Sequence, residues 1–263
     1  MERAADTDGK AVRRAFQKLS RYETEARLLR KRSEEYDVLE EVFDRPTLLT
    51  VHGIMNEGVF RVLNGVVDAG KEARVYWGVR EDGSSVAVKI FLTVAREFVN
   101  RLPYILGDPR FKRARRRGVG LIEDWVRKEF ANLQRAFEVG VPVPRPIRVK
   151  RNVLVMEFIG EDGVAAPLLA QVPVSKSDYR RIIPLLRKFY HDAGLVHADL
   201  SEFNVFKWRG RLILFDLGSA VDRRHPRAEE FLRRDVHNIH RFFSKRGITE
   251  ETFEEALRRV LKA

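Results

Sequence analysis

The chain has 263 residues, 44% of them hydrophobic, which is enough to bury a sizeable core as one large domain or two lobes. It has no cysteine, which excludes disulfides and thiolate metal sites, and no apolar run of the eighteen or so residues that cross a membrane. Its 50 Lys and Arg exceed its 38 Asp and Glu by a formal charge of +12, which favours polyanionic partners such as RNA, and we expect a soluble, cytoplasmic protein.

The first 45 residues are dense in charge. Phe16, Leu19, Tyr22 and Ala26 recur at helical spacing, which predicts an amphipathic helix. Such a helix is expected to pack on the lobe that follows, and a dedicated RNA-binding helix is the alternative. A short helical stretch is expected from Leu48 to Leu63.

A glycine-containing turn joins two strand-like runs between Asn64 and Arg80. Gly65–Glu72 fits a phosphate-binding G-x-x-x-x-G-K loop as far as the lysine. However, Glu72 replaces the hydroxyl residue that ligates magnesium, and a strand follows in place of a helix. We therefore predict a strand-turn-strand flap whose backbone amides near Gly70 approach phosphates, with an ordinary glycine hairpin as the alternative.

Lys89 lies on an alternating apolar strand, Val86–Phe91, where an unpaired buried ammonium is costly. The string V-A-V-K matches the strand lysine of protein kinases, which contacts nucleotide phosphates and pairs with a glutamate on a helix. The helix predicted from Leu121 to Glu138 carries Glu129 in or beside an apolar stripe that ends at Phe137. We predict an ion pair between Lys89 and Glu129, and the alternative is that Glu129 is a solvated flank residue.

Six Lys and Arg crowd the nine residues from Arg110 to Gly118. Runs of like charge are usually solvated, and contact with RNA phosphates is the alternative. A hairpin is predicted next, from Ile147–Val149 and Val153–Phe158, and the chain then leaves the sheet through Met156–Gly160. In a two-lobed nucleotide enzyme, backbone groups of this connecting strand read the adenine edge.

The segment from Val196 to Asp216 carries the predicted chemistry. His197, Asp199 and Asn204 fit H-x-D-x-x-x-x-N, the catalytic-loop spacing of kinases, in which the aspartate accepts or orients a hydroxyl proton and the asparagine ligates magnesium. His197 is expected to be a packed, hydrogen-bonded core histidine. A hairpin at Arg209-Gly210 returns the chain to Asp-Leu-Gly, a D-F-G-like metal motif whose aspartate then lies beside Asn204.

With these motifs in this order, the chain resembles the RIO family of atypical serine/threonine protein kinases, specifically its Rio one branch in archaeal-like form. The resemblance covers roughly residues 45–245 and rests on AGKEARVY, WVRKEFANL, MEFIG followed by APLL, LVHADLSEFN and HPRAEEFLRRDVHNIHRFF. One departure is Asp68-Ala69, which replaces the Ser-Thr that is usual in the family's nucleotide loop.

The resemblance implies an α+β, two-lobed protein-kinase-like fold. It has an antiparallel N-lobe sheet with one αC-type helix, a reduced helical C-lobe and N-terminal helices. The expected divisions are residues 1–63 for the charged N-terminal helices, 64–159 for the N-lobe with its flap and connecting strand, and 160–263 for the C-lobe.

The resemblance also implies ATP and Mg²⁺, with Mn²⁺ as a substitute, autophosphorylation on serine or threonine, and ATPase activity. It implies a role in late maturation of the small ribosomal subunit, with the subunit precursor and its rRNA as partners and with neither membrane nor DNA. Asp216 is implied as a transient phosphoacceptor. The expected site residues are Asp199 and Asp216 for catalysis, Asn204 and Asp216 for the metal, and Gly70, Lys71, Glu72, Val75, Lys89, Glu129, Met156, Glu157 and Ile159 for the nucleotide.

Two other classes of function stay open: a small-molecule phosphotransferase, which shares the H-x-D-x4-N loop, and a catalytically idle RNA-binding assembly factor. Residues 217–263 contain no A-P-E and are few for the helices that hold peptide or metabolite acceptors. Asp235, His237 and His240 suggest a metal site, but they lie on a predicted helix with a buried apolar face, so structural or surface roles are expected.

Overall fold

The computed structural model describes residues 43–93, 100–111 and 114–262. Nearly all of the helix predicted within residues 1–45 therefore lies outside the described residues. The chain divides into two compact units, residues 1–48 and residues 49–263. The sheet, the catalytic motifs and the candidate site all belong to the second unit.

The first described helix, α2 (Arg45–Asn56), is shorter than the helix predicted from Leu48 to Leu63. It ends because Gly58 takes a left-handed backbone with φ 76° and donates its N–H to the carbonyl of Met55. The chain then enters strand β1 at Val62, so the last residues of the predicted helix are extended.

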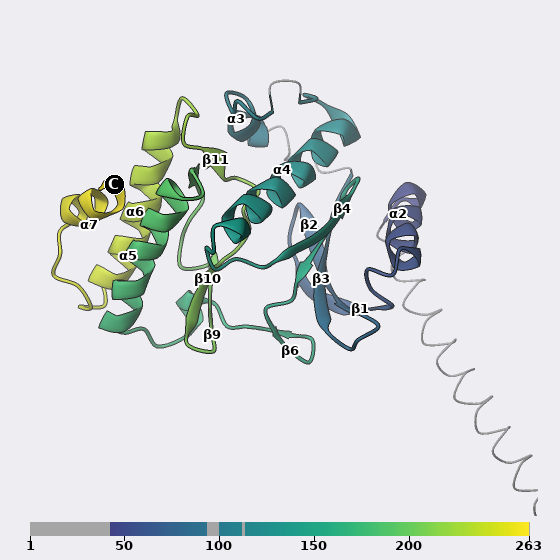
Figure 1. Ribbon diagram of the computed structural model, residues 1–263, viewed down its shortest axis with the longest axis horizontal. Coiled ribbons are helices and arrows are strands. Elements are labelled where there is room, and N and C mark those ends of the chain that lie inside the picture. The colour runs from purple at the N-terminus through teal and green to yellow at the C-terminus, as the bar shows by residue number, and fades with distance from the viewer. Residues whose placement is uncertain (1–42, 94–99, 112–113, 263) are drawn as a thin grey trace, which may run out of the picture. The chain divides into compact units, whose positions relative to one another are not determined.

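One five-stranded antiparallel sheet forms the first half of the second unit (Figure 1). Its strand order is β1-β2-β3-β5-β4. The strands are β1 (Val62–Ala69), β2 (Ala73–Val79), β3 (Ser85–Phe91), β4 (Pro146–Lys150) and β5 (Val153–Glu157). The predicted flap is the β1–β2 hairpin, and β3 is the central strand, in which Lys89 lies opposite Val75 on one side and Leu154 on the other.

The long helix α4 (Gly118–Glu138) packs against β4 and β5, and the short helix α3 (Leu102–Ile105) precedes it. Its buried face includes Leu121, Val126, Glu129 and Leu133, as the apolar spacing predicts. Phe137 departs from that prediction because it is 43% exposed and lines a surface cavity near the end of the helix.

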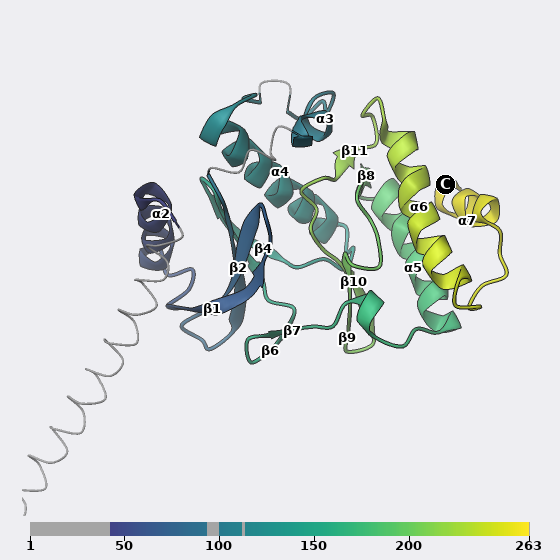
Figure 2. The same ribbon diagram turned by 180° about the vertical axis from the view of Figure 1, so that it is seen from behind.

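Helices make up most of the second half of the second unit. Helices α5 (Lys176–His191), α6 (Ala228–Ser244) and α7 (Phe253–Leu261) pack on one another, as the two opposite views in Figures 1 and 2 show. The remaining elements are β6 (Gly160–Glu161), β7 (Val164–Ala165), the 3-10 helix η2 (Leu169–Gln171), β8 (Leu195–Val196), β9 (Val205–Trp208), β10 (Arg211–Leu214) and β11 (Val221–Asp222). This sheet-and-helix arrangement is the predicted two-lobed, kinase-like α+β fold.

The β9–β10 hairpin delivers the second half of the catalytic segment. Arg209 and Gly210 form its turn with φ of 47° and 74°, and positive φ at both central residues is the type I′ geometry that suits a two-residue hairpin. The strands pair Val205 with Leu214, so the residues that flank the hairpin return to the same place. Asn204 and Asp216 therefore lie at the two open ends of the same hairpin.

Candidate active site

The catalytic loop (residues 197–204) and the loop that carries the D-F-G-like motif (residues 216–220, the metal-motif loop) meet through short polar contacts. The side-chain amide of Asn204 donates to the carbonyl oxygen of Asp199 at 2.7 Å, and the N–H of Phe215 donates to the carbonyl of Asn204 at 3.1 Å. Because the amide nitrogen of Asn204 is committed to the backbone of Asp199, its Oδ1 is the atom left to bind another group. The structure thus brings together Asp199, Asn204 and Asp216, as predicted.

Side chains of helix α6 hold the catalytic loop through the backbone groups of that loop. The carboxylate of Asp235, which is buried, accepts N–H groups from Ala198 at 2.8 Å and Leu200 at 2.9 Å. Asn238 donates to the carbonyl of Leu200, and Arg234 donates to that of Ala198. These contacts surround Ala198, whose φ of 64° is uncommon for a residue other than glycine. Burial raises the pKa of Asp235 to about 6.

His197 is the packed histidine that the sequence predicted. It is buried, its Nε2 donates to the carbonyl oxygen of Phe215 at 3.0 Å, and its ring lies against Phe189. The described residues contain no group of three or more His, Asp or Glu placed to share an ion. His240 contacts the carbonyl of Glu251, and His237 packs on Phe253.

The predicted ion pair between Lys89 and Glu129 is confirmed. Lys89 Nζ lies 2.8 Å from Glu129 Oε1 and 3.0 Å from Oε2, and the Glu129 side chain is 0% exposed. The same ammonium donates to Asp216 Oδ1 at 2.7 Å. Burial lowers the pKa of Lys89, but the charges of Asp216 and Glu129 outweigh burial and raise it, so Lys89 stays a cation between two carboxylates.

The two aspartates of the site have pKa values that move in opposite directions. Burial raises the pKa of Asp199, although the charges of His197 and Arg101 oppose the change. Lys89 lowers the pKa of Asp216 and keeps it ionised, against the effect of burial. Two carboxyl groups whose environments separate their pKa values suit different tasks, one in proton transfer and the other as a permanent anion.

A cavity of about 400 Å³ opens between the flap and these groups. Of the predicted nucleotide residues, Gly70, Lys71, Glu72, Val75, Lys89 and Met156 line it, together with Asp216. Glu157 and Ile159 line a larger cavity of about 710 Å³, to which none of the catalytic residues contributes. We place the chemistry in the smaller cavity because the perturbed acidic and basic groups converge there.

Arg101 is a residue of this cavity that sequence reasoning missed. Its Nε donates to Glu72 Oε1 at 3.0 Å, and its Nη1 donates to the hydroxyl of Ser219 at 3.3 Å. Its guanidinium lies over the ring of Trp125. A cation that joins the flap to the metal-motif loop adds positive charge where phosphates would enter.

The basic run from Arg110 to Gly118 is only partly solvated. Arg110 forms a bidentate contact with Asp108, with nitrogen to oxygen distances of 2.9 and 2.7 Å, and Arg115 pairs with Glu123 and Asp124. Lys112 and Arg113 lie outside the described residues. Arg116 and Arg117 are exposed, so the charge available to an RNA is smaller than the sequence suggests.

The donor atoms present fit a magnesium ion. Asn204 has its Oδ1 uncommitted, and the Asp216 side chain is 47% exposed with one oxygen outside the contact to Lys89. Magnesium takes few protein ligands and keeps water and phosphate oxygens for the rest of its octahedron, so two protein oxygens suffice. Asn204 and Asp216 are the residues that would hold it.

Comparison with known proteins agrees with this geometry. A family model described as the RIO domain matches residues 74–256. The chain belongs to the RIO family of atypical serine/threonine kinases. It is 41% identical over 225 residues to the RIO-type serine/threonine-protein kinase Rio1 of Haloferax volcanii, covering 85% of this chain and 77% of that one. It is 37% identical to the human serine/threonine-protein kinase RIO1, covering 82% of this chain but only 39% of the relative.

The fold is similar to solved RIO kinases. The Rio2 kinase of Chaetomium thermophilum, in a structure described as an ADP/Mg²⁺-phosphoaspartate complex, matches with a TM-score of 0.59 and 26% identity. The match covers 82% of this chain and 66% of that chain. No helix in the described part of the chain is long and apolar enough to cross a membrane.

Proposed function

We propose that this chain is an ATP- and Mg²⁺-dependent serine/threonine kinase and ATPase that phosphorylates itself and acts in the cytoplasm on precursors of the small ribosomal subunit. The observation that carries the catalytic part is Lys89, which bridges Glu129 and Asp216 at the wall of a cavity that the flap covers. The family membership and the +12 charge support the ribosomal part.

The residues divide the work of phosphoryl transfer as the geometry suggests. Lys89 and the flap amides near Gly70 bind and orient phosphates, because the cation and the glycine turn line the same cavity. Asp199, with its raised pKa, orients the attacking hydroxyl and accepts its proton. Asn204 and Asp216 hold Mg²⁺, with Mn²⁺ as a substitute, and the metal neutralises charge on the phosphates when bound.

Asp216 itself is proposed as a phosphoacceptor during ATP turnover. The solved structure of the Chaetomium Rio2 is described as a phosphoaspartate complex of that protein. Here Asp216 is ionised and half-exposed, and its contact with Lys89 uses only Oδ1. Attack of a carboxylate oxygen on the γ-phosphorus forms an acyl phosphate while the bond to the β–γ bridging oxygen breaks and ADP leaves with that electron pair. Water then hydrolyses the acyl phosphate and regenerates Asp216.

The proposal is tested by ATP turnover in Asp199→Ala and Asp216→Ala, each checked for folding by circular dichroism. Both variants should lose turnover by at least about 100-fold, and unchanged turnover in both would reject the mechanism. Acid-quenched protein labelled from γ-³²P-ATP should carry a hydroxylamine-labile fraction in the wild type, apart from the hydroxylamine-resistant label of serine or threonine phosphate, and no labile fraction in Asp216→Asn.

Cosedimentation with small ribosomal subunits, with and without ATP, tests the partner. We expect binding that ATP turnover weakens in the wild type and that persists in Asp216→Ala. Rapid specific turnover of a small metabolite, or absence of nucleotide binding by calorimetry, would favour a metabolite phosphotransferase or a catalytically idle RNA-binding factor, respectively.

A further inference from the structure

A fully buried lysine reaches from α4 into the loop that follows Asp216. Lys128 is 0% exposed, and its Nζ donates to the carbonyl oxygen of Gly218 at 2.8 Å and also to that of Ala220. Among the described residues no carboxylate forms an ion pair with this ammonium. Burial lowers the pKa of Lys128 to about 7, although the charge of Asp108 opposes the change. The ring of Trp125 lies 5.3 Å away. Burying an ammonium against backbone carbonyls alone costs folding free energy, so packing by itself does not explain this lysine.

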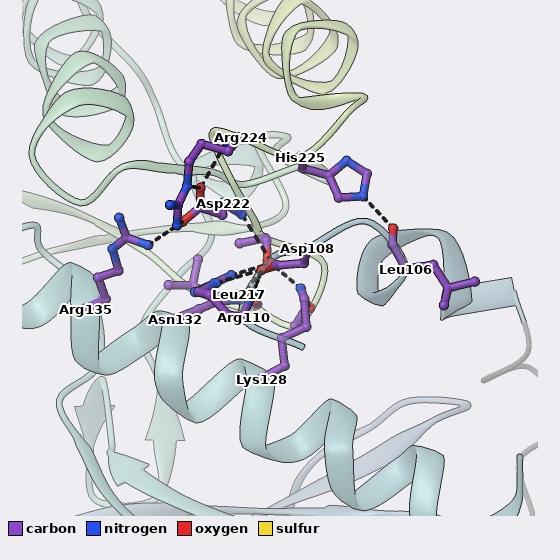
Figure 3. Close-up of polar contacts among 12 residues, drawn as sticks. Leu106, Asp108, Arg110, Lys128, Asn132, Arg135, Leu217, Asp222, Arg224 and His225 are labelled. Carbon is purple, nitrogen blue, oxygen red and sulfur yellow. Dashed lines mark hydrogen bonds and ion pairs between the residues drawn. The ribbon is translucent and has the colours of Figure 1, made fainter. Parts of the chain in front are cut away.

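Asn132, one turn further along α4, acts on the same loop. Its side-chain nitrogen donates to the carbonyls of Leu217 and Ala220, both at 2.8 Å, and its oxygen accepts Arg110 Nη1 at 2.8 Å. Figure 3 shows Lys128 and Asn132 pointing from one helix toward the segment that carries Leu217. Three carbonyls of residues 217–220 are therefore bound by two side chains of α4.

The backbone of this loop needs such support. Asp216 has a left-handed φ of 58°, which an aspartate adopts at a cost of about 1 kcal/mol or more. Trp125, also on α4, packs so closely that a Cβ at Gly218 would lie 2.9 Å from its ring. A different conformation of residues 216–220 would leave the Lys128 ammonium buried without acceptors, so the contacts select one arrangement.

We propose that Lys128 and Asn132 are positioning residues for phosphoryl transfer, which fix the metal-motif loop to α4 through the carbonyl oxygens of Leu217, Gly218 and Ala220. Glu129 is the residue next to Lys128, so the helix that orients Lys89 also sets the direction of the Asp216 carboxylate. The inference rests on the proposed role of Asp216 as a metal ligand. Neither Lys128 nor Asn132 lines the nucleotide cavity, and neither is a proposed metal ligand.

The variant Lys128→Met tests the proposal because it keeps the length of the side chain and removes its donors. At saturating ATP, the free Mg²⁺ that gives half-maximal turnover should rise by about tenfold or more, as loss of a group that orients a metal ligand typically does. The affinity for ATP in EDTA should stay within about twofold, because Lys89 and the flap are untouched. Asn132→Leu should shift the Mg²⁺ dependence in the same direction.

The matched control is Arg127→Met, the neighbouring residue, which is exposed and contacts Asp124; its Mg²⁺ dependence should be that of the wild type. If Lys128→Met does not fold, Lys128→Gln, which keeps one donor, takes its place. A role in stability alone predicts a lower melting temperature with an unchanged Mg²⁺ midpoint, and that result in both Lys128 variants overturns the proposal.

Asp216→Asn separates this inference from the proposed function. Because Asp216 variants lose turnover, the readout here is the affinity for ATP by calorimetry as a function of free Mg²⁺. If that affinity depends on Mg²⁺ in Asp216→Asn as it does in the wild type, Asp216 is not a metal ligand and the proposed function itself fails. If Asp216→Asn loses the dependence and the Lys128 variants keep that of the wild type, the role of Asp216 stands and only the positioning by α4 is rejected.

Discussion

Removing Lys89 should destabilise the fold far more than removing its partner Glu129. In Lys89→Met the Glu129 carboxylate, 0% exposed, loses its hydrogen bonds to the Lys89 ammonium, and an uncompensated buried charge costs about 3–5 kcal/mol. In Glu129→Gln the ammonium keeps Asp216 at 2.7 Å, so the expected loss is about 1–3 kcal/mol. The double variant should lose less than the sum, with a coupling free energy of about 2 kcal/mol.

Urea unfolding of nucleotide-free protein measures these differences. With an m-value of about 3 kcal/mol per molar, Lys89→Met should lower the midpoint by about 1–1.7 M. The control is Lys150→Met, which breaks a surface pair with Glu57 whose side chains are 37% and 35% exposed, and which should cost less than about 1 kcal/mol. If the two site variants add to within about 0.5 kcal/mol in the double variant, Lys89 and Glu129 are not coupled and the reasoning is refuted.

Three further predictions follow from single contacts. Burial raises the pKa of Asp235 from 3.8 to about 6, so its contribution to stability is complete below about pH 4 and is lost as the pH rises through 6. The unfolding free energy of the wild type minus that of Asp235→Asn should therefore shrink by about 3 kcal/mol between about pH 4 and pH 7, and a constant difference would contradict the shift. Gly218→Ala should cost about 1–3 kcal/mol in urea unfolding because its Cβ meets the Trp125 ring, and Gly65→Ala, where a Cβ meets nothing within 4 Å and φ is not positive either, is the control. Reversing the charge of Arg116 and Arg117 should weaken cosedimentation with ribosomal subunits and reduce the slope of log affinity on log salt by about 1–2, and an unchanged slope would mean that the run does not contact RNA.

The pairs that the sequence predicted share a local cause. A lysine on an apolar strand and a glutamate on an apolar helix stripe each require a partner of opposite charge, so Lys89 and Glu129 were found without coordinates. Asn204 and Asp216 were found because a short hairpin returns the chain to its start. The end of α2 was missed because the helical pattern outweighed the stop signal at Gly58.

The residues that were missed bind backbone groups far away in sequence. Lys128 contacts carbonyls about 90 residues further along the chain, and Asp235 accepts N–H groups 35 and 37 residues before it. Backbone groups are the same in every residue, so no sequence pattern marks them as partners. Lys128 also stands in the string Arg-Lys-Glu, where a lysine is indistinguishable from an ordinary solvated helix charge.

The two loops of the site are held by opposite chemistry. The catalytic loop on both sides of Asp199 offers N–H groups to the carboxylate of Asp235 on α6, whereas the loop after Asp216 offers carbonyls to the side-chain nitrogen of Lys128 on α4. Asp235 belongs to α6, which packs against the other C-terminal helices. Lys128 belongs to α4, which packs against the sheet. Neither helix holds both loops, and the direct tie between the loops is Phe215, whose N–H donates to the carbonyl of Asn204 and whose carbonyl accepts His197 Nε2. Movement of α4 that carried Asp216 and Glu129 together would therefore have to break or carry along these two contacts beside Asp199.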